Sequence, residues 1–118
     1  MIVAICGSRY WTDRRTIGSF LILFPNDTLI ATGDCRGVDC LVKEICGEVG
    51  LKCVVHEADW DRYGKSAGPR RNTEILDSAQ PNIVVAFHED IENSKGTKDM
   101  LKQAKCRSIP TILITGSG

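Results

Sequence analysis

The chain has 118 residues, with 15 basic and 15 acidic side chains and therefore no formal net charge. This length predicts one domain over residues 1–118, and a composition of 42% hydrophobic and 25% charged residues excludes the disordered and fibrous classes. No apolar run approaches the roughly 20 residues of a membrane span, and the balanced charge gives no general attraction to nucleic acid or anionic membranes. Met1–Gly7 lacks the basic flank and cleavage site of a signal peptide, so we expect a cytoplasmic protein, in the host cytoplasm if the source is viral.

Six cysteines are spread along the chain without a Cys-x-x-Cys pair, and His56 and His88 lie far from any ligand-like spacing. Their density is too low for a secreted disulfide scaffold. We therefore expect reduced structural thiols in a reducing compartment, with no metal and no cofactor. The cysteines are Cys6, Cys35, Cys40, Cys46, Cys53 and Cys106.

Short apolar runs alternate with helical patterns along the whole chain. The runs predict strands at 2–6, 28–32, 51–57, 82–87 and 109–114. Apolar residues at spacings of three and four predict the helices between them, which carry Ile17, Phe20, Leu21 and Phe24; Val38, Leu41, Val42, Ile45 and Val49; Ile75, Leu76 and Ala79; and Met100, Leu101 and Ala104. Thr12 or Asp13 is expected to cap the first helix and Gly50 to end the second. The alternation predicts the α/β class, as a doubly wound parallel sheet of about five strands with helices on both faces.

The segments that follow the strands differ from those that precede them. Residues 7–11, 33–37, 58–68 and 88–96 hold glycines, arginines, aromatics and carboxylates, whereas the opposite edge holds bare turn residues. Ligands bind in open α/β sheets at the carboxyl ends of the strands. We therefore expect the functional residues at this edge.

Three turns at this edge combine small residues with donors suited to phosphate. Gly7-Ser8-Arg9 and Gly33-Asp34-Cys35-Arg36-Gly37 follow the first two strands, and Ser94-Lys95-Gly96-Thr97 precedes the last helix. Free amides at a helix start favour an anion, so the turns indicate one or more phosphate groups. The alternative is that the glycines serve turn geometry alone.

The segment 58–65 places two aromatics among alternating charges. Trp60 or Tyr63 is suited to stack on a base or ribose while Lys65 meets a phosphate, and the alternative is an amphipathic loop covering the sheet edge. At the start of the following helix, Arg71 is a candidate for the cleft and Asn72 for a bond to the ligand or a neighbouring loop. A solvated arginine pair is the alternative for Arg70 and Arg71.

The remaining polar residues of this edge have less specific signals. His88 is either a general base or a polar loop residue. Four carboxylates either bind ribose hydroxyls or pair with the arginines, and they are Asp34, Asp39, Glu57 and Asp59.

These residues resemble the YspA-type branch of the SLOG superfamily. The shared motifs extend from residue 1 to about 115 and comprise Gly7-Ser8-Arg9-x-Trp11, Gly33-x-x-Arg36-Gly37-Val38-Asp39, the stretch from Ala58-Asp59-Trp60 to Arg71-Asn72, and Gly96-Thr97-x-Asp99-Met100. The resemblance implies a Rossmann-like fold that binds a nucleotide or ADP-ribose-like ligand. The ligand-binding residues that it implies are Gly7, Ser8, Arg9, Trp11, Gly33, Asp34, Arg36, Gly37, Asp39, Asp59, Trp60, Tyr63, Lys65, Arg71, Asn72, Gly96 and Thr97.

The superfamily includes LOG phosphoribohydrolases, which cleave an N-glycosidic bond and carry a Gly-Thr-x-x-Glu signature. Here Met100 stands at the glutamate position and Asp99 lies one residue earlier, rotated by about 100° around a helix. Catalysis of that kind therefore requires Asp99 or another cleft carboxylate to substitute, with Arg71 as the cation. Asp99 and Arg71 are the candidate catalytic residues.

Three functions follow from this resemblance. The first is a non-catalytic domain that captures a nucleotide-derived small molecule as a sensor, carrier or sponge. The alternative is a nucleotide-processing hydrolase of the N-glycosidic or phosphoester kind. Single-stranded nucleic-acid binding, as in DNA-processing protein A, is disfavoured because the acids equal the bases. No membrane partner is expected. Because oligomers are common in this superfamily, the resemblance also implies a homo-oligomer as one possibility for this chain.

Overall fold

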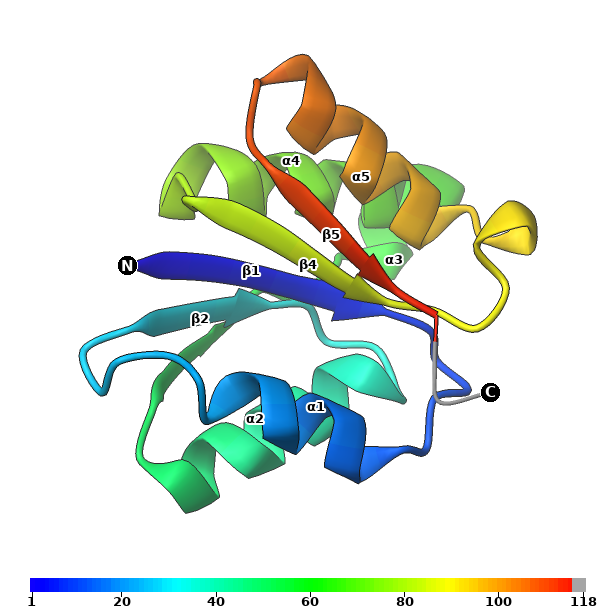
Figure 1. Cartoon of the computed structure of the whole chain (residues 1–118). Coiled ribbons are helices and arrows are strands. Elements are labelled where there is room, and N and C mark those ends of the chain that lie inside the picture. The colour runs from blue at the N-terminus through cyan, green and yellow to red at the C-terminus, as the bar shows by residue number, and fades with distance from the viewer. Residues whose placement is uncertain (116–118) are drawn as a thin grey trace.

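The computed structural model describes residues 1–115, which form one parallel five-stranded sheet with the strand order β3-β2-β1-β4-β5. Figure 1 shows the strands side by side, with β1 at the centre. The elements in chain order are β1 (Ile2–Gly7), α1 (Arg14–Leu21), β2 (Leu29–Thr32), α2 (Val38–Val49), β3 (Lys52–Val55), α3 (Trp60–Tyr63), η1 (Gly64–Ser66), α4 (Ala67–Ala79), β4 (Ile83–Phe87), η2 (Ile91–Asn93), α5 (Gly96–Cys106) and β5 (Thr111–Ile114). The predicted fold class is confirmed: a Rossmann-like α/β fold.

The two faces of the sheet are covered by different helices. Figure 1 shows α1 and α2 on one face and α4 and α5 on the other. Because side chains alternate along a strand, Val3 and Ile5 of β1 join the core under α1 and α2, while Ala4 between them joins the core under α4 and α5. Burial of both faces explains why these strands are continuously apolar in the sequence. Among residues 1–115, no helix has the length and apolar character needed to cross a membrane.

Local signals place several of the helix ends. The Asp13 side chain accepts a hydrogen bond from the Thr16 backbone N–H and caps α1, and Gly50 ends α2 with a left-handed φ of 79°. Four of the predicted strands are shorter than expected. The second and fourth each begin one residue later, at Leu29 and Ile83, the third spans Lys52–Val55, and the fifth begins at Thr111, after Pro110. A proline has no N–H to donate to a strand ladder.

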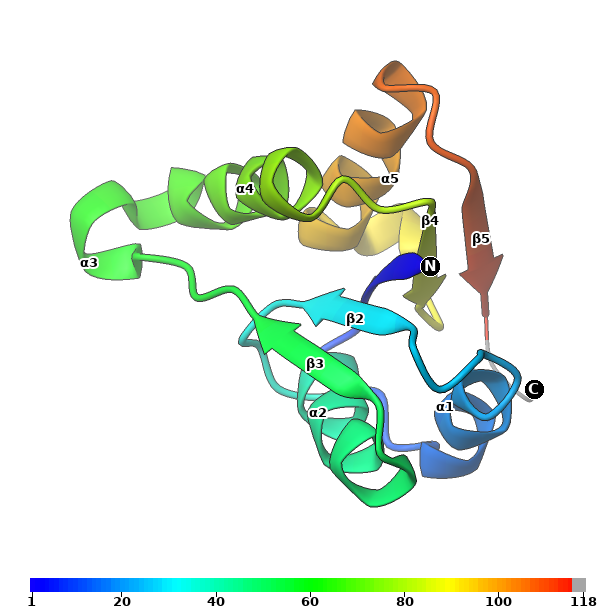
Figure 2. The same cartoon turned by 90° about the vertical axis from the view of Figure 1, so that its left-hand side faces the viewer.

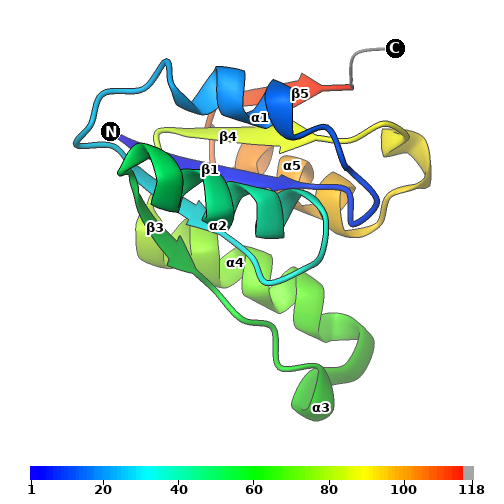
Figure 3. The ribbon, with the colours of Figure 1, turned by 90° about the horizontal axis from the view of Figure 1, so that it is seen from below.

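The polar segment 58–66, which follows β3, contains helical turns rather than a plain loop, and we refer to it as the arm. It contains the short helices α3 and η1, and Asp59 caps α3 by accepting from the Arg62 backbone N–H at 3.2 Å. In Figures 2 and 3 α3 stands out from the sheet, and α4 leads from it back across the sheet face. The arm therefore lies beside the carboxyl edge without joining the core.

The strand order reverses between β1 and β4, since the chain runs from β1 outward to β3 and then returns to the other side of β1. The loops after β1 and β4 part at this point, which is where ligands bind in open α/β sheets. A Cβ on Gly7 would lie well inside 3.0 Å of the Phe87 carbonyl, so glycine permits the close approach of the two strand ends. The fold thus opens a cleft at the edge that carries the predicted motifs.

Candidate functional site

A cavity of about 410 Å³ lies at the carboxyl edge of the sheet. It brings together eight of the predicted ligand-binding residues: Gly7, Ser8, Arg9, Asp39, Arg71, Asn72, Gly96 and Thr97. A second cavity of about 400 Å³ is lined by Arg9, Asp34, Cys35, Arg36 and Trp60. Arg9 and Cys35 line both cavities, so the two adjoin there. We refer to them as the main cavity and the arm cavity.

The remaining predicted residues line neither cavity. Trp11 is buried in the core, edge-on to Phe87 with ring centroids 5.7 Å apart, and its indole N–H donates to the Asp13 carbonyl. Asp59 caps α3, as described above. Those outside both cavities are Trp11, Gly33, Gly37, Asp59, Tyr63, Lys65 and the candidate catalytic Asp99.

The loop after β1 is joined to the start of α2 by the backbone of Ser8. The Ser8 N–H donates to the Phe87 carbonyl at 2.9 Å, and the Ser8 carbonyl accepts from the Val38 N–H at 3.1 Å. Gly37 has a φ of +73°, and a Cβ there would lie well inside 3.0 Å of the Ser8 carbonyl oxygen. Both the left-handed backbone and the close approach require glycine at this position. Gly37 therefore shapes the main cavity without lining it.

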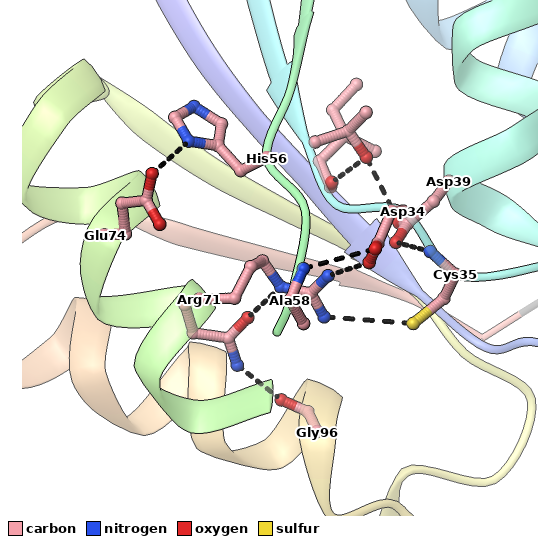
Figure 4. Close-up of polar contacts among 11 residues, drawn as sticks. Asp34, Cys35, Asp39, His56, Ala58, Arg71, Glu74 and Gly96 are labelled. Carbon is pink, nitrogen blue, oxygen red and sulfur yellow. Dashed lines mark hydrogen bonds and ion pairs between the residues drawn. The ribbon is translucent and has the colours of Figure 1, made fainter. Parts of the chain in front are cut away.

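Arg71 is a buried cation that joins α4 to the loop after β2 at the main cavity. Its Nη1 donates to Asp34 Oδ1 at 2.8 Å, its Nη2 lies 3.8 Å from the Cys35 sulfur, and its Nε donates to Asn72 Oδ1 at 3.3 Å. The other Asp34 oxygen accepts from the Ala58 N–H at 3.2 Å, which attaches the start of the arm (Figure 4). Burial opposes the charge of Arg71, but the Cys35 sulfur, Asp39 and Asp34 together hold its pKa above the ordinary value.

Gly33 makes room for this guanidinium. A Cβ at position 33 would lie 2.7 Å from Arg71 Cζ and 2.7 Å from Asp39 Oδ2. The predicted turn glycine is thus needed for a close approach, because Arg71 and Asp39 converge on its backbone.

Asp39 is a buried carboxyl group with a raised pKa. Burial is the main cause that raises its pKa to about 6, against the hydrogen bond from the Cys35 N–H, the charge of Arg71 and the Thr32 hydroxyl, which lower it. The Thr32 hydroxyl oxygen lies 2.8 Å from the Ile5 carbonyl and 3.1 Å from Asp39 Oδ1, and it donates to both.

Asn72 connects α4 to α5. Its Nδ2 donates to the Gly96 carbonyl and to Asp99 Oδ2, both at 3.1 Å, and Asp99 also accepts from Gln103 Nε2 at 2.7 Å. The Asp99 carboxylate is therefore engaged behind Asn72. Met100, at the glutamate position of the LOG signature, is 1% exposed and packs in the core, as its helical stripe predicts.

Three cations at the cleft have no partner in the part of the chain that the structure describes. Within residues 1–115, neither hydrogen bonds nor ion pairs engage the side-chain charges of Arg9, Arg36 and Lys95, whereas Arg71 pairs with Asp34. Lys95 lines the main cavity and was not among the predicted site residues, although it lies in the predicted turn 94–97. Unpaired cations around a cavity leave positive charge available to an anion.

The loop after β4 contributes acceptors to the main cavity. Glu89 Oε1 accepts from the Ser8 hydroxyl at 2.8 Å, and the Asp90 N–H donates to His88 Nδ1 at 2.9 Å. Because His88 Nδ1 accepts this hydrogen bond, it carries no proton, and the contact between Nδ1 and Glu89 Oε2 at 3.8 Å is therefore not an ion pair. His88 is built into the turn, and Glu89 is the loop carboxylate held at the cavity wall. Sequence reasoning did not select Glu89, Asp90 or Asn93 of this wall.

The two aromatics of the arm have different surroundings. The Tyr63 ring is covered by the Arg70 guanidinium at 4.3 Å, with Arg62 at 5.1 Å. Trp60 is 47% exposed and lines the arm cavity. Of the two predicted stacking residues, Trp60 alone lines either cavity.

Comparisons with known proteins agree with this fold. The model of the YspA, cpYpsA-related SLOG family matches residues 1–63. The chain is 31% identical over 119 residues to the Gene 61 protein of Mycobacterium phage D29, covering 93% of each. Its fold is similar to that of the UDP-GlcNAc 2-epimerase from Neisseria meningitidis, solved bound to UDP-GlcNAc, with a TM-score of 0.61 and 11% identity over 96% of this chain and 31% of the epimerase chain. The protein therefore belongs to the YspA, cpYpsA-related SLOG family.

Proposed function

We propose that the protein binds a nucleotide or nucleotide-derived small molecule, of the nucleoside phosphate or ADP-ribose kind, as a sensor, carrier or sponge. The observation that carries the proposal is a set of cations around adjoining cavities, Arg9, Arg36 and Lys95, for which residues 1–115 supply no partner. A phosphate is the anion for which this arrangement is suited, since α2 and α5 also begin at this edge and direct their positive dipole ends toward it.

The size and polar lining of the main cavity fit such a ligand. About 410 Å³ falls within the range of small-molecule sites, which span roughly 300–1,000 Å³. Glu89, Asp90 and Asn93 supply acceptors for sugar hydroxyls beside the cations. The epimerase was solved with a nucleotide sugar, UDP-GlcNAc, on a related fold, although at 11% identity this likeness concerns the fold alone.

Calorimetric titration with AMP, ADP-ribose, cyclic ADP-ribose and NAD tests the proposal. At least one should bind, and Arg9→Ala should weaken that binding about tenfold or more, because a hydrogen bond to a charged group contributes about 1.5–3 kcal/mol. Arg15→Ala is the matched control, because it removes the same charge from the exposed side of α1, away from both cavities. Absence of binding by all four compounds, or equal losses in the two variants, would contradict the proposal.

Hydrolysis of the bound nucleotide is a second candidate, and Glu89 is the observation in its favour. Its carboxylate lines the main cavity and is anchored by the Ser8 hydroxyl, whereas Asp99 is engaged with Asn72 and Gln103. N-glycosidic cleavage develops positive charge on the ribose, which a nearby carboxylate stabilises. Chromatography of the same compounds after incubation separates the candidates. Release of free base by wild type but not by Glu89→Gln supports hydrolysis. Recovery of the intact compounds from wild type supports binding alone.

A further inference from the structure

The arm cavity has a composition that the main cavity lacks. Its wall contains the exposed indole of Trp60 together with Arg9 and Arg36, which lack protein partners among the described residues. Its carboxylate, Asp34, is already neutralised by Arg71 at 2.8 Å and by the Ala58 N–H. The cavity therefore offers an aromatic surface and net positive charge.

Trp60 is held in place rather than freely exposed. It is the first residue of α3, directly after the cap Asp59, whose side chain accepts from the Arg62 N–H. Gly68 at the start of α4 lies beneath the ring, since a Cβ there would be 3.3 Å from Trp60 Cη2. An indole that is 47% exposed and fixed at one edge leaves surface available for stacking with little entropy left to lose.

Arg9 connects this indole to the main cavity. It lines both cavities and has no partner within residues 1–115, so one anionic group at Arg9 borders both spaces. A single extended molecule is therefore able to place an aromatic ring on Trp60, a phosphate at Arg9 and a polar group in the main cavity.

We propose that the arm cavity is a base-stacking compartment, in which Trp60 takes the heteroaromatic base of a ligand whose phosphate lies at Arg9. The rest of the ligand beyond that phosphate fills the main cavity, so the ligand class is a nucleoside diphosphate with a polar substituent rather than a mononucleotide. This inference rests on the proposed function and assigns the two ends of its ligand.

The test compares a ligand that has a base with one that lacks it. ADP-ribose and ribose 5-phosphate are titrated into wild type, Trp60→Leu and Tyr63→Leu by calorimetry, and tryptophan emission is followed in parallel. Tyr63→Leu is the matched control. It removes an aromatic ring from the same short helix, and the Tyr63 ring lines neither cavity. Thermal melts followed by circular dichroism confirm that each variant is folded.

We expect Trp60→Leu to weaken ADP-ribose binding about tenfold, within the usual range for loss of base stacking, and to leave ribose 5-phosphate unchanged. ADP-ribose should quench the emission of wild type and of Tyr63→Leu, but not the emission of Trp60→Leu, whose remaining Trp11 is buried. AMP should bind at least tenfold more weakly than ADP-ribose.

Two results would overturn the compartment while sparing the proposed function. One is that ADP-ribose and ribose 5-phosphate both require Arg9 but ADP-ribose is unaffected by Trp60→Leu. The other is that both compounds lose equal affinity in Trp60→Leu, because the ring then supports the cavity and does not stack on a base. If neither compound binds wild type, the compartment fails, and the titrations with AMP, cyclic ADP-ribose and NAD then decide the proposed function separately.

Discussion

The Arg71 guanidinium donates to the Asp34 carboxylate at 2.8 Å, across 37 positions of the sequence, and this pair joins the loop after β2 to α4. The Arg71 side chain is 9% exposed, so the pair is largely withdrawn from water. Its charge supports the architecture of the cleft, while the cations available to a ligand are Arg9, Arg36 and Lys95.

Replacing Arg71 should therefore destabilise the fold. Arg71→Met keeps an apolar stem but leaves Asp34 without its cation, and breaking a buried pair costs about 3–5 kcal/mol. We expect a loss near the lower end of that range in urea unfolding, because the Asp34 side chain is 27% exposed. Arg107→Met is the control, since its pair with Asp77 is at the surface and should contribute less than about 1 kcal/mol. Equal losses in the two variants would refute the distinction.

Gly37→Ala should disturb the cleft more than a left-handed backbone alone explains. Gly37 and Gly50 have φ values of +73° and +79°, but a Cβ collides with Ser8 at the first and meets nothing within 4 Å at the second. The left-handed helical conformation of Gly50, with a ψ of 24°, costs about 1–2 kcal/mol for alanine, whereas Gly37, with a ψ of −122°, has a backbone that alanine adopts less readily. We expect Gly50→Ala to show that cost in its unfolding free energy and Gly37→Ala to exceed it clearly. The idea that Gly37 spaces the two loops is wrong if the two losses match.

The raised pKa of Asp39 predicts an unusual dependence of stability on pH. Because its pKa is about 6 in the fold and 3.8 ordinarily, the folded state binds more protons than the unfolded state between these values. The contribution of this group is complete below about pH 4 and is lost as the pH rises through about 6. The loss amounts to about 3 kcal/mol for a shift of this size.

Asp39→Asn isolates this contribution from those of the other acids. The asparagine oxygen keeps the acceptor for the Cys35 N–H, and the amide group does not change its charge over this pH range. Urea unfolding from pH 4 to pH 8 should show a decline in wild type relative to the variant. Parallel stability curves for the two proteins would mean that Asp39 is ionised throughout.

Asp99 should act on structure and not on the ligand. Asp99→Ala removes an acceptor shared by Asn72 and Gln103, and we expect a loss of about 1 kcal/mol in unfolding free energy. Affinity for ADP-ribose should change less than twofold, because Asp99 lines neither cavity. A tenfold loss of affinity in calorimetry with a normal melting temperature would place Asp99 in the ligand site.

The fold was predictable because its signals are local. The continuous apolar runs of β1 and β4 reflect burial on both faces, and Gly50 ends α2 through its own φ. The arm was predicted only as a polar segment, because a four-residue helix such as α3 lacks an apolar stripe and depends on the single cap at Asp59.

The position of the site was predictable, but the roles of its residues were not. The turns at one sheet edge follow from parallel topology, and eight of the predicted residues line the main cavity. A single sequence does not show that Arg71 pairs with Asp34 while Arg9 stays unpaired, because pairing is set by distances between loops far apart in the chain. Trp11 and Trp60 are likewise the same residue type, and packing alone buries the first and exposes the second.

The most direct test of the account is a crystal structure of the protein soaked with ADP-ribose. Density should extend from the main cavity into the arm cavity, with a phosphate oxygen within hydrogen-bonding distance of Arg9, the cation common to both. ADP-ribose bound elsewhere on the surface, with both cavities holding solvent alone, would contradict the account.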